Sequence, residues 1–280
     1  MKELKRVVLT HGIEVAYDDS GIKNKPTLLF IHGLANYYGV WNWNIDTLKA
    51  PFRCIAIDLP GNGFSSRNGT NYSIDFYAGI LIEFIITLQL KNVVLVGHSM
   101  GGLIALKVAL SKRIPLQKMI LCAPAGFEKY TPQESVLFKS AIAMGNFLNL
   151  DETQLAQSVR TSFFRQSEIT DKIISDLSKI IQQNNRSLYR SMLEQSIYSM
   201  LDENIFKDLK HIPCKTLVFF GEEDALIPNK FLHPVSTKEI ATKATAQMPQ
   251  ATLIMYENCG HFVHIEKANK VNEAIIQFLK

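Results

Sequence analysis

The stretch 93–106 constrains the fold of this chain more than any other part of the sequence. Residues 93–96 are apolar and mostly β-branched, which is typical of a buried strand. They lead into Gly97-x-Ser99-x-Gly101 and then into an apolar, helix-forming run. A strand that reverses into a helix this abruptly strains its central residue and crowds the two flanking positions, where glycine fits because it has no Cβ atom. The pattern predicts a nucleophile elbow that presents the hydroxyl of Ser99.

Composition excludes several classes of protein. The chain has 280 residues, of which 47% are hydrophobic and 20% charged, as is ordinary for a soluble globular enzyme with one large domain or a domain with an insertion. The net charge of +4 is mild. No dense stripe of Lys and Arg with interleaved aromatic residues occurs, which argues against a nucleic-acid partner.

The sequence also bears on the compartment. The first residues contain no apolar stretch of signal-peptide length, and no run approaches the ~20 apolar residues of a membrane span. The four cysteines lie far apart, in or beside apolar strand-like runs, as buried free thiols do, rather than at the spacing of a disulfide framework or a zinc site. We expect a cytoplasmic protein without a metal or another cofactor.

Apolar strand-like runs alternate with helical patterns along most of the chain. The predicted strands are 6–10, 13–17, 27–31, 53–58, 93–96, 118–123, 216–220 and 252–256. The predicted helices between and after them are 41–49, a helix capped by Ser73 that runs to about residue 88, 100–111, 235–247 and a final amphipathic helix. Uninterrupted apolar strands that alternate with helices indicate a mostly parallel sheet with helices on both faces.

The alternation stops after the sixth strand. From 127 to 210 only helical patterns occur, at 133–148, 152–164, 168–181 and 187–201. We interpret this stretch as a helical lid laid over the strand ends. The predicted division is a core of residues 1–126 and 211–280 with a lid of residues 127–210. Most of the lid's Met and aromatic side chains are expected to pack between its helices, and a few to line an apolar cleft.

Two polar residues that follow later strands could activate Ser99. A serine at its free pKa is a poor nucleophile and needs a base that is itself oriented by an acid. Asp224 lies in the turn after the strand 216–220, with Glu222 and Glu223 as rivals of the same type. For the base, the candidates are His261, directly after the last strand, and His264, its rival nearer the next helix.

Two backbone N–H groups are candidates for holding the oxyanion of a tetrahedral intermediate. One is the N–H of Met100, which follows the nucleophile at the start of a helix. The other belongs to the loop 32–35 after the strand 27–31, where the N–H of Leu34 is the favoured donor. Gly33 in this loop permits a close backbone approach.

The motifs together resemble those of α/β-hydrolases, in particular the group of lidded serine esterases, meta-cleavage-product hydrolases and cofactor-free haloperoxidases. The matching residues are His32-Gly33, Asp58-Leu59-Pro60-Gly61-x-Gly63-x-Ser65, Gly97-His98-Ser99-Met100-Gly101-Gly102, Gly221-x-x-Asp224 and Gly260-His261. They cover nearly the whole chain outside the lid. The resemblance implies an α/β-hydrolase fold with an eight-stranded sheet, and Ser99, Asp224 and His261 as nucleophile, acid and base.

The leading functional hypothesis is hydrolysis of a carboxylic ester or thioester with an apolar acyl or alkyl group. Trp41, Phe127 and Phe262 are the candidate substrate-contacting residues. The partner expected is a small-molecule ester. The mild positive charge is compatible with an acidic carrier protein, although the mixed charges of the lid do not single one out. The sequence does not define the oligomeric state.

Two other functions stay open. The first is hydrolysis of a carbon–carbon bond in a meta-cleavage-type vinylogous diketone acid, a class in which tryptophan often follows the catalytic histidine, whereas Phe262 stands there in this chain. That reaction needs a cationic or polar group for the substrate carboxylate, which the sequence does not locate. The second is a non-catalytic ligand receptor built on a hydrolase fold, because fold alone does not define function.

Overall fold

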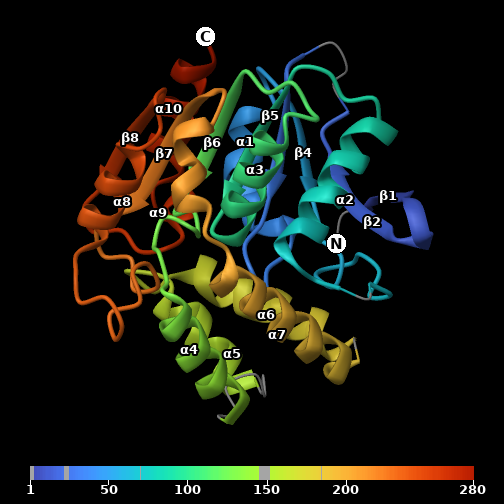
Figure 1. Cartoon of the computed structure of the whole chain (residues 1–280). Helices are drawn as coiled ribbons and strands as arrows, with labels where there is room; N and C mark the ends of the chain where they lie inside the picture. Colours follow the sequence, from blue (N-terminus) through green and yellow to red (C-terminus); the bar gives the residue numbers. More distant parts are fainter. Residues whose placement is uncertain (1–2, 22–24, 70, 145–151, 184) are drawn as a thin grey trace.

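An eight-stranded sheet forms the centre of the molecule (Figure 1). The computed structural model describes residues 3–21, 25–69, 71–144, 152–183 and 185–280. Its strands are β1 (Lys5–Val8), β2 (Glu14–Asp19), β3 (Thr27–Ile31), β4 (Arg53–Ile57), β5 (Val93–His98), β6 (Lys118–Cys122), β7 (Lys215–Gly221) and β8 (Ala251–Tyr256). They lie in the order β1-β2-β4-β3-β5-β6-β7-β8. The pairs β1–β2 and β2–β4 are antiparallel and all others are parallel, which confirms the predicted mostly parallel sheet.

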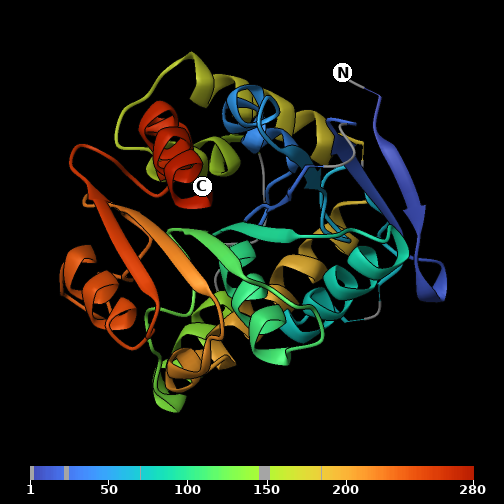
Figure 2. The same ribbon diagram turned by 90° about the horizontal axis from the view of Figure 1, so that it is seen from above.

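Helices cover both faces of this sheet. They are α1 (Asn42–Leu48), α2 (Ile74–Thr87), α3 (Met100–Ser111), α8 (Thr237–Thr245), α9 (Val263–Glu266) and α10 (Ala268–Leu279), with short 3₁₀ turns at Thr10–Gly12, Tyr38–Trp41 and Ile205–His211. Figure 2 shows α1 and α10 on one side of the sheet and α2, α3 and α8 on the other. The central strands β3 and β5 are buried at every position, which explains their unbroken apolar sequences.

Local capping explains two of the helix starts. Ser73 precedes α2 and accepts a hydrogen bond from the N–H of Phe76 at 3.2 Å, as its position in the sequence predicted. Ser236 caps α8 in the same way, so this helix begins at Thr237, two residues later than the sequence suggested. All four cysteines are buried and free, which confirms the prediction for them. No helix among the described residues is long and apolar enough to cross a membrane.

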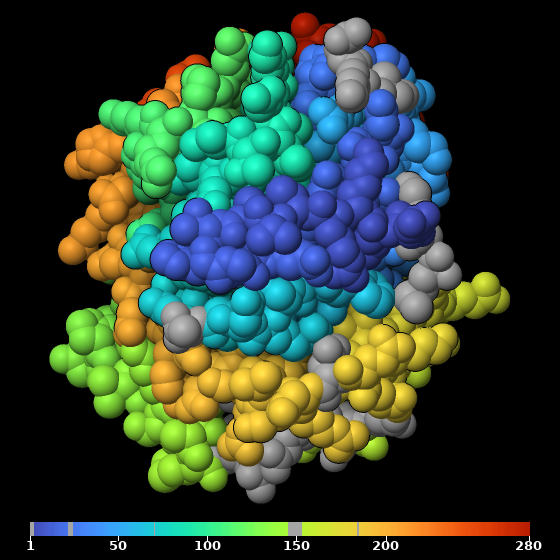
Figure 3. Space-filling model, turned by 90° about the vertical axis from the view of Figure 1, so that its right-hand side faces the viewer, coloured from blue at the N-terminus to red at the C-terminus, as the bar shows by residue number. Residues whose placement is uncertain are grey.

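The segment between β6 and β7 is helical, and in Figure 1 it lies below the sheet. Its helices are α4 (Pro132–Met144), α5 (Glu152–Thr161), α6 (Glu168–Gln182) and α7 (Arg186–Asp202). Figure 3 shows part of this segment, in yellow, beneath the dark-blue N-terminal hairpin. The end of the predicted helix 133–148 falls at 145–148, outside the described residues. The lid bounds 127–210 remain a prediction.

One lid helix ends earlier than the sequence suggested. The predicted helix 152–164 ends at Thr161. Beyond it, the N–H groups of Phe164 and Arg165 donate to the carboxylate of Glu266 in α9, at 3.0 and 3.4 Å. These N–H groups therefore bind a carboxylate of the core instead of continuing the helix. No local sequence pattern predicts this contact.

Candidate active site

The elbow has the strained geometry that its sequence predicted. Ser99 joins β5 to α3 with φ 53° and ψ −119°, values that non-glycine residues rarely adopt. A Cβ atom on Gly97 would lie 2.4 Å from the carbonyl oxygen of Gly101. One on Gly101 would lie 2.3 Å from the carbonyl oxygen of Ile31. Both neighbours are backbone atoms, so only glycine fits at either position.

The predicted acid and base are in direct contact. The Nδ1–H of His261 donates to Oδ2 of Asp224 at 2.8 Å, and both side chains are almost completely buried. The other carboxylate oxygen of Asp224 accepts the N–H groups of Leu226 and Ile227, at 2.8 and 3.0 Å. With Asp224 held in this way, the imidazole keeps its proton on Nδ1 and leaves Nε2 as the basic nitrogen. The rival Glu223 instead accepts the N–H of Cys259 at 3.0 Å.

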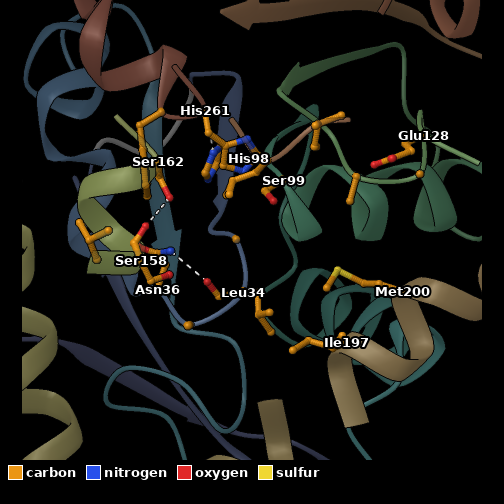
Figure 4. Close-up of a pocket in the computed structure, with 18 of the residues that line it drawn as sticks. Leu34, Asn36, His98, Ser99, Glu128, Ser158, Ser162, Ile197, Met200 and His261 are labelled. Atoms are coloured by element: carbon orange, nitrogen blue, oxygen red, sulfur yellow. Dashed lines mark hydrogen bonds between the residues drawn. The ribbon is translucent and has the colours of Figure 1, made fainter. Parts of the chain in front are cut away.

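Ser99 and His261 line the same pocket, and Figure 4 shows their side chains next to each other. Within the described residues, no hydrogen bond joins the Ser99 hydroxyl to His261. Such contacts are often long in ligand-free enzymes and shorten in the complex with substrate. The arrangement thus brings the three predicted catalytic residues together at the carboxyl ends of β5, β7 and β8.

The loop after β3 lies against the elbow. A Cβ atom on Gly33 would be 3.1 Å from the Cβ of Ser99, so the backbone of this loop passes close to the hydroxyl. His32 fixes the loop, because its Nδ1–H donates to the carbonyl of Gly33 at 2.7 Å while its Nε2 accepts the N–H of Leu59 at 3.0 Å. Burial lowers the pKa of His32 to about 4, which keeps this ring neutral.

Both predicted oxyanion donors border this region. Leu34 lines the pocket, and its N–H donates to no acceptor among the described residues. Met100 is the first residue of α3, where an N–H group has no partner within the helix. The positive end of the helix dipole adds to the field at the same point.

The pocket encloses about 290 Å³, a small volume for a ligand site. Its walls are mostly apolar. The core contributes residues that follow its strands, including Ser99 and His261, and the helical segment between β6 and β7 contributes Phe138, Leu155, Val159, Leu177, Ile197, Met200 and Leu201. None of the described residues that line it is Lys or Arg. No group of three or more His, Cys, Asp or Glu in the described part of the chain is arranged to hold a metal ion.

Of the three residues expected to contact substrate, only Phe262 lines this pocket. Trp41 is fully buried and packs on Phe30 and on His264, with ring centroids 5.1 and 4.1 Å away. Phe127 is also buried and packs on Phe220 at 5.9 Å. Trp41 and Phe127 are therefore core residues beside the site.

The rival base His264 lies behind the site. It is fully buried and is not among the described residues that line the pocket. Burial lowers its pKa to about 3, so it is neutral at ordinary pH. His98 separates it from the pocket: the His98 ring lies 4.5 Å from that of His264, and its Nε2–H donates to the carbonyl of His261 at 3.1 Å. His98 thus supports the loop of the predicted base.

The lid is attached to that same loop. The N–H of His261 donates to the carbonyl of Ser162 at 2.9 Å. Glu266 accepts the N–H of Gly260 at 2.8 Å and, with its other oxygen, that of Phe164 at 3.0 Å. The ring of Phe163 stacks on Phe262 at 4.6 Å. One carboxylate therefore ties the histidine loop to the end of α5.

Sequence reasoning missed a second polar group of the pocket. Glu128 follows β6 at the catalytic edge of the sheet, is buried and lines the pocket, and bonds to His233 at 2.6 Å. Its position directly after a buried strand is a signal that could have identified it. The bond to His233 could not be predicted from the sequence, because 105 residues separate the two positions along the chain.

Comparisons with known proteins identify the family of the fold. The alpha/beta hydrolase fold family matches residues 26–268. The chain is 28% identical to (E)-2-((N-methylformamido)methylene)succinate hydrolase of Acinetobacter baylyi, over 99% of this chain and 98% of that protein. An esterase of Exiguobacterium antarcticum superposes with a TM-score of 0.82 at 21% identity, covering 98% of each chain.

A meta-cleavage product hydrolase of Pseudomonas fluorescens superposes with a TM-score of 0.77 at 22% identity, over 98% of this chain and 97% of that one. At these identities the superpositions show the fold alone, and the family match carries the assignment. With that match over most of its length, this chain belongs to the alpha/beta hydrolase fold family.

Proposed function

We propose that this chain is a serine hydrolase that cleaves carboxylic esters or thioesters with a largely apolar acyl or alkyl group that carries no carboxylate. Ser99 is the nucleophile, His261 the general base and then acid, and Asp224 the group that orients and stabilises His261. The N–H groups of Leu34 and Met100 hold the oxyanion.

The reaction has two halves. The Ser99 oxygen attacks the carbonyl carbon while its proton passes to Nε2 of His261, and the carbonyl electron pair moves to the oxygen between the Leu34 and Met100 N–H groups. Collapse of this intermediate expels the alcohol or thiol, which takes the proton from His261, and leaves an ester on Ser99. Water, deprotonated by His261, then attacks that ester, and the acid leaves with Ser99 regenerated.

The observation that carries the proposal is the Asp224–His261 pair in one pocket with a strained Ser99. The 2.8 Å bond fixes the histidine tautomer, and φ 53° at the elbow holds the Ser99 hydroxyl at the pocket. A receptor without activity has no need of either feature, which makes the non-catalytic alternative the weaker one.

The wall chemistry favours esters over the carbon–carbon bond alternative. The substrate of a meta-cleavage-type reaction carries a carboxylate, which a cation in the pocket binds more strongly than a neutral polar group does. Among the described lining residues there is no Lys or Arg, and Glu128 would repel a carboxylate. An uncharged substrate meets neither problem.

Turnover of p-nitrophenyl butyrate tests the proposal. Ser99→Ala should lower kcat/KM by about 10³-fold or more, because the variant has no nucleophile. Ser158→Ala is the matched control, since Ser158 is another serine of the same pocket, and it should cost far less. Comparable losses in both variants, or ester hydrolysis unchanged in Ser99→Ala, would overturn the assignment.

A further inference from the structure

Glu128 is a buried carboxylate in the wall of an otherwise mostly apolar pocket. Its side chain is only 5% exposed, and Figure 4 shows it across Ser99 from Ser158 and Ser162. Burying a charge without partners is costly, so the contacts of this group reveal what it is built to hold.

Three donors already bind this carboxylate. Its Oε1 accepts the N–H of Asn229 at 2.8 Å and the Nδ1–H of His233 at 2.6 Å. Its Oε2 accepts the hydroxyl of Tyr130 at 2.8 Å. An ionised carboxylate offers about four acceptor directions, so one direction at Oε2 has no donor among the described residues.

The groups around Glu128 direct hydrogen-bond donors at its carboxylate. The second ring nitrogen of His233 lies 3.3 Å from Oε1 of Glu134, on the side of the ring away from Glu128. Burial beside Glu128 raises the pKa of Tyr130, so its hydroxyl stays protonated and donates. With its O–H donated to Glu128, the Tyr130 oxygen can still accept a hydrogen bond.

Glu128 and Tyr130 therefore offer the pocket acceptors only. Both residues line it. An apolar group would leave the free acceptor direction unsatisfied, and a carboxylate would meet another carboxylate; a hydroxyl or an ammonium group would fill that direction.

We propose that Glu128 and Tyr130 form a subsite for a hydrogen-bond-donating group, a hydroxyl or an ammonium, on the substrate of this hydrolase. The subsite rests on the proposed function, in which Ser99 attacks the ester carbonyl in the same pocket. It narrows the substrate class to esters whose apolar chain carries such a donor away from the scissile bond.

A set of matched esters tests the subsite. The set comprises p-nitrophenyl hexanoate and its counterparts whose far end is a hydroxyl, an ammonium or a carboxylate. The wild type should prefer a donor-ended ester to the methyl-ended one by about tenfold in kcat/KM and should discriminate against the carboxylate-ended one. The ratio between the hydroxyl- and ammonium-ended esters identifies which donor the subsite takes.

Two variants and one control locate that preference. Glu128→Gln should lower the donor-to-methyl ratio by about tenfold, and Tyr130→Phe should lower it by a smaller factor. Glu134→Gln removes a carboxylate on the far side of His233, outside the pocket lining, and should keep the ratio within about twofold. An unchanged ratio in Glu128→Gln, or a wild type that prefers the carboxylate-ended ester, overturns the subsite.

Binding to Ser99→Ala separates this proposal from the catalytic one. Calorimetry with hexylammonium and with hexanoate requires no turnover. Hexylammonium should bind more tightly than hexanoate, and Glu128→Gln in the same background should abolish the difference. Equal binding of both ligands contradicts the subsite even where esters are hydrolysed. If no ester is hydrolysed by the wild type but hexylammonium binding depends on Glu128, only the proposed function fails.

Discussion

The elbow and the lid border the same pocket but are held in place by different means. At the elbow, backbone atoms define the site: a Cβ atom added to Gly97 or to Gly101 would lie within 2.4 Å of a backbone carbonyl oxygen. At the lid, single side chains define it, with Glu266 and Glu128 each binding groups about a hundred residues away in the chain. Backbone crowding dictates residue types locally, whereas these side-chain bonds depend on two distant positions at once.

The largest effect on activity is expected at Asp224, which orients His261, the predicted proton acceptor for Ser99. Asp224→Asn should lower kcat by about 10⁴-fold, because an amide no longer selects the His261 tautomer with a free Nε2. Steady-state kinetics with p-nitrophenyl butyrate measures this. The control is Glu223→Gln, which changes the neighbouring carboxyl that bonds to Cys259, and a loss as large in that variant would contradict the role of Asp224.

Glycine substitutions test the claim that backbone crowding shapes the elbow. Gly101→Ala should destabilise the fold by about 1–3 kcal/mol and abolish turnover, because its new methyl group meets the carbonyl oxygen of Ile31. Urea unfolding measures the change. Gly79→Ala is the matched control: nothing lies within 4 Å of its added Cβ, and it is in the middle of α2.

The control should behave in the opposite way. Gly79→Ala is expected to stabilise the protein by about 0.5–1 kcal/mol, since alanine loses less chain entropy in a helix. If both variants changed the free energy of unfolding alike, crowding would not be what requires glycine at the elbow.

Two buried aspartates of the core should respond to pH with opposite signs. Burial raises the pKa of Asp58 from 3.8 to about 7 in the folded chain, although the N–H groups of Phe64 and Tyr38 oppose the shift. Between these values the folded state holds a proton that the unfolded state has released, so this group's contribution to stability falls as pH rises from about 4 to 7.

The contribution of Asp19 to stability depends on pH in the opposite direction. Burial opposes its ionisation, but hydrogen bonds from Arg53 and Lys5 hold its pKa well below 3.8, so its contribution is present above about pH 4 and is lost as pH falls. Melting temperatures of wild type and Asp58→Asn across pH 4–7, and of wild type and Asp19→Asn from about pH 5 down to about pH 2, check the two signs. The deficit of Asp58→Asn relative to wild type should shrink as pH rises, and a growing deficit would contradict the raised pKa.

The smallest effect is expected at the lid. Glu266→Gln should cost about 1–2 kcal/mol, because an amide nitrogen cannot accept one of the N–H bonds that link Gly260 and Phe164. kcat should fall by less than in the Asp224→Asn variant, since the carboxylate positions the His261 loop without touching substrate. Glu273→Gln, an exposed change on α10, should affect neither stability nor rate, and an identical result for Glu266→Gln would mean that the lid contact is not needed.

The contrast between the elbow and the lid also explains which features of the structure could be predicted from the sequence. The fold, the order of Ser99, Asp224 and His261 along the chain, and the Asp224–His261 contact were predictable. Apolar strands, glycines at crowded turns and polar residues after strand ends each leave a local sequence pattern. Trp41 and Phe127 were predicted as substrate contacts, but both pack in the core and neither is among the described residues that line the pocket. An aromatic residue near a site shows the same sequence pattern whether it lines the pocket or packs behind it. Glu128 and Glu266 went unnoticed because their partners lie far away in the chain.

The central claim is that Ser99 is a nucleophile activated at the elbow. Reaction with a fluorophosphonate, followed by mass spectrometry of the digested protein, tests it without any assumption about the substrate. One adduct should form on the peptide that carries Ser99, and none in Ser99→Ala, while His261→Ala should react much more slowly. An adduct on another serine, or undiminished labelling of Ser99→Ala, would contradict the account.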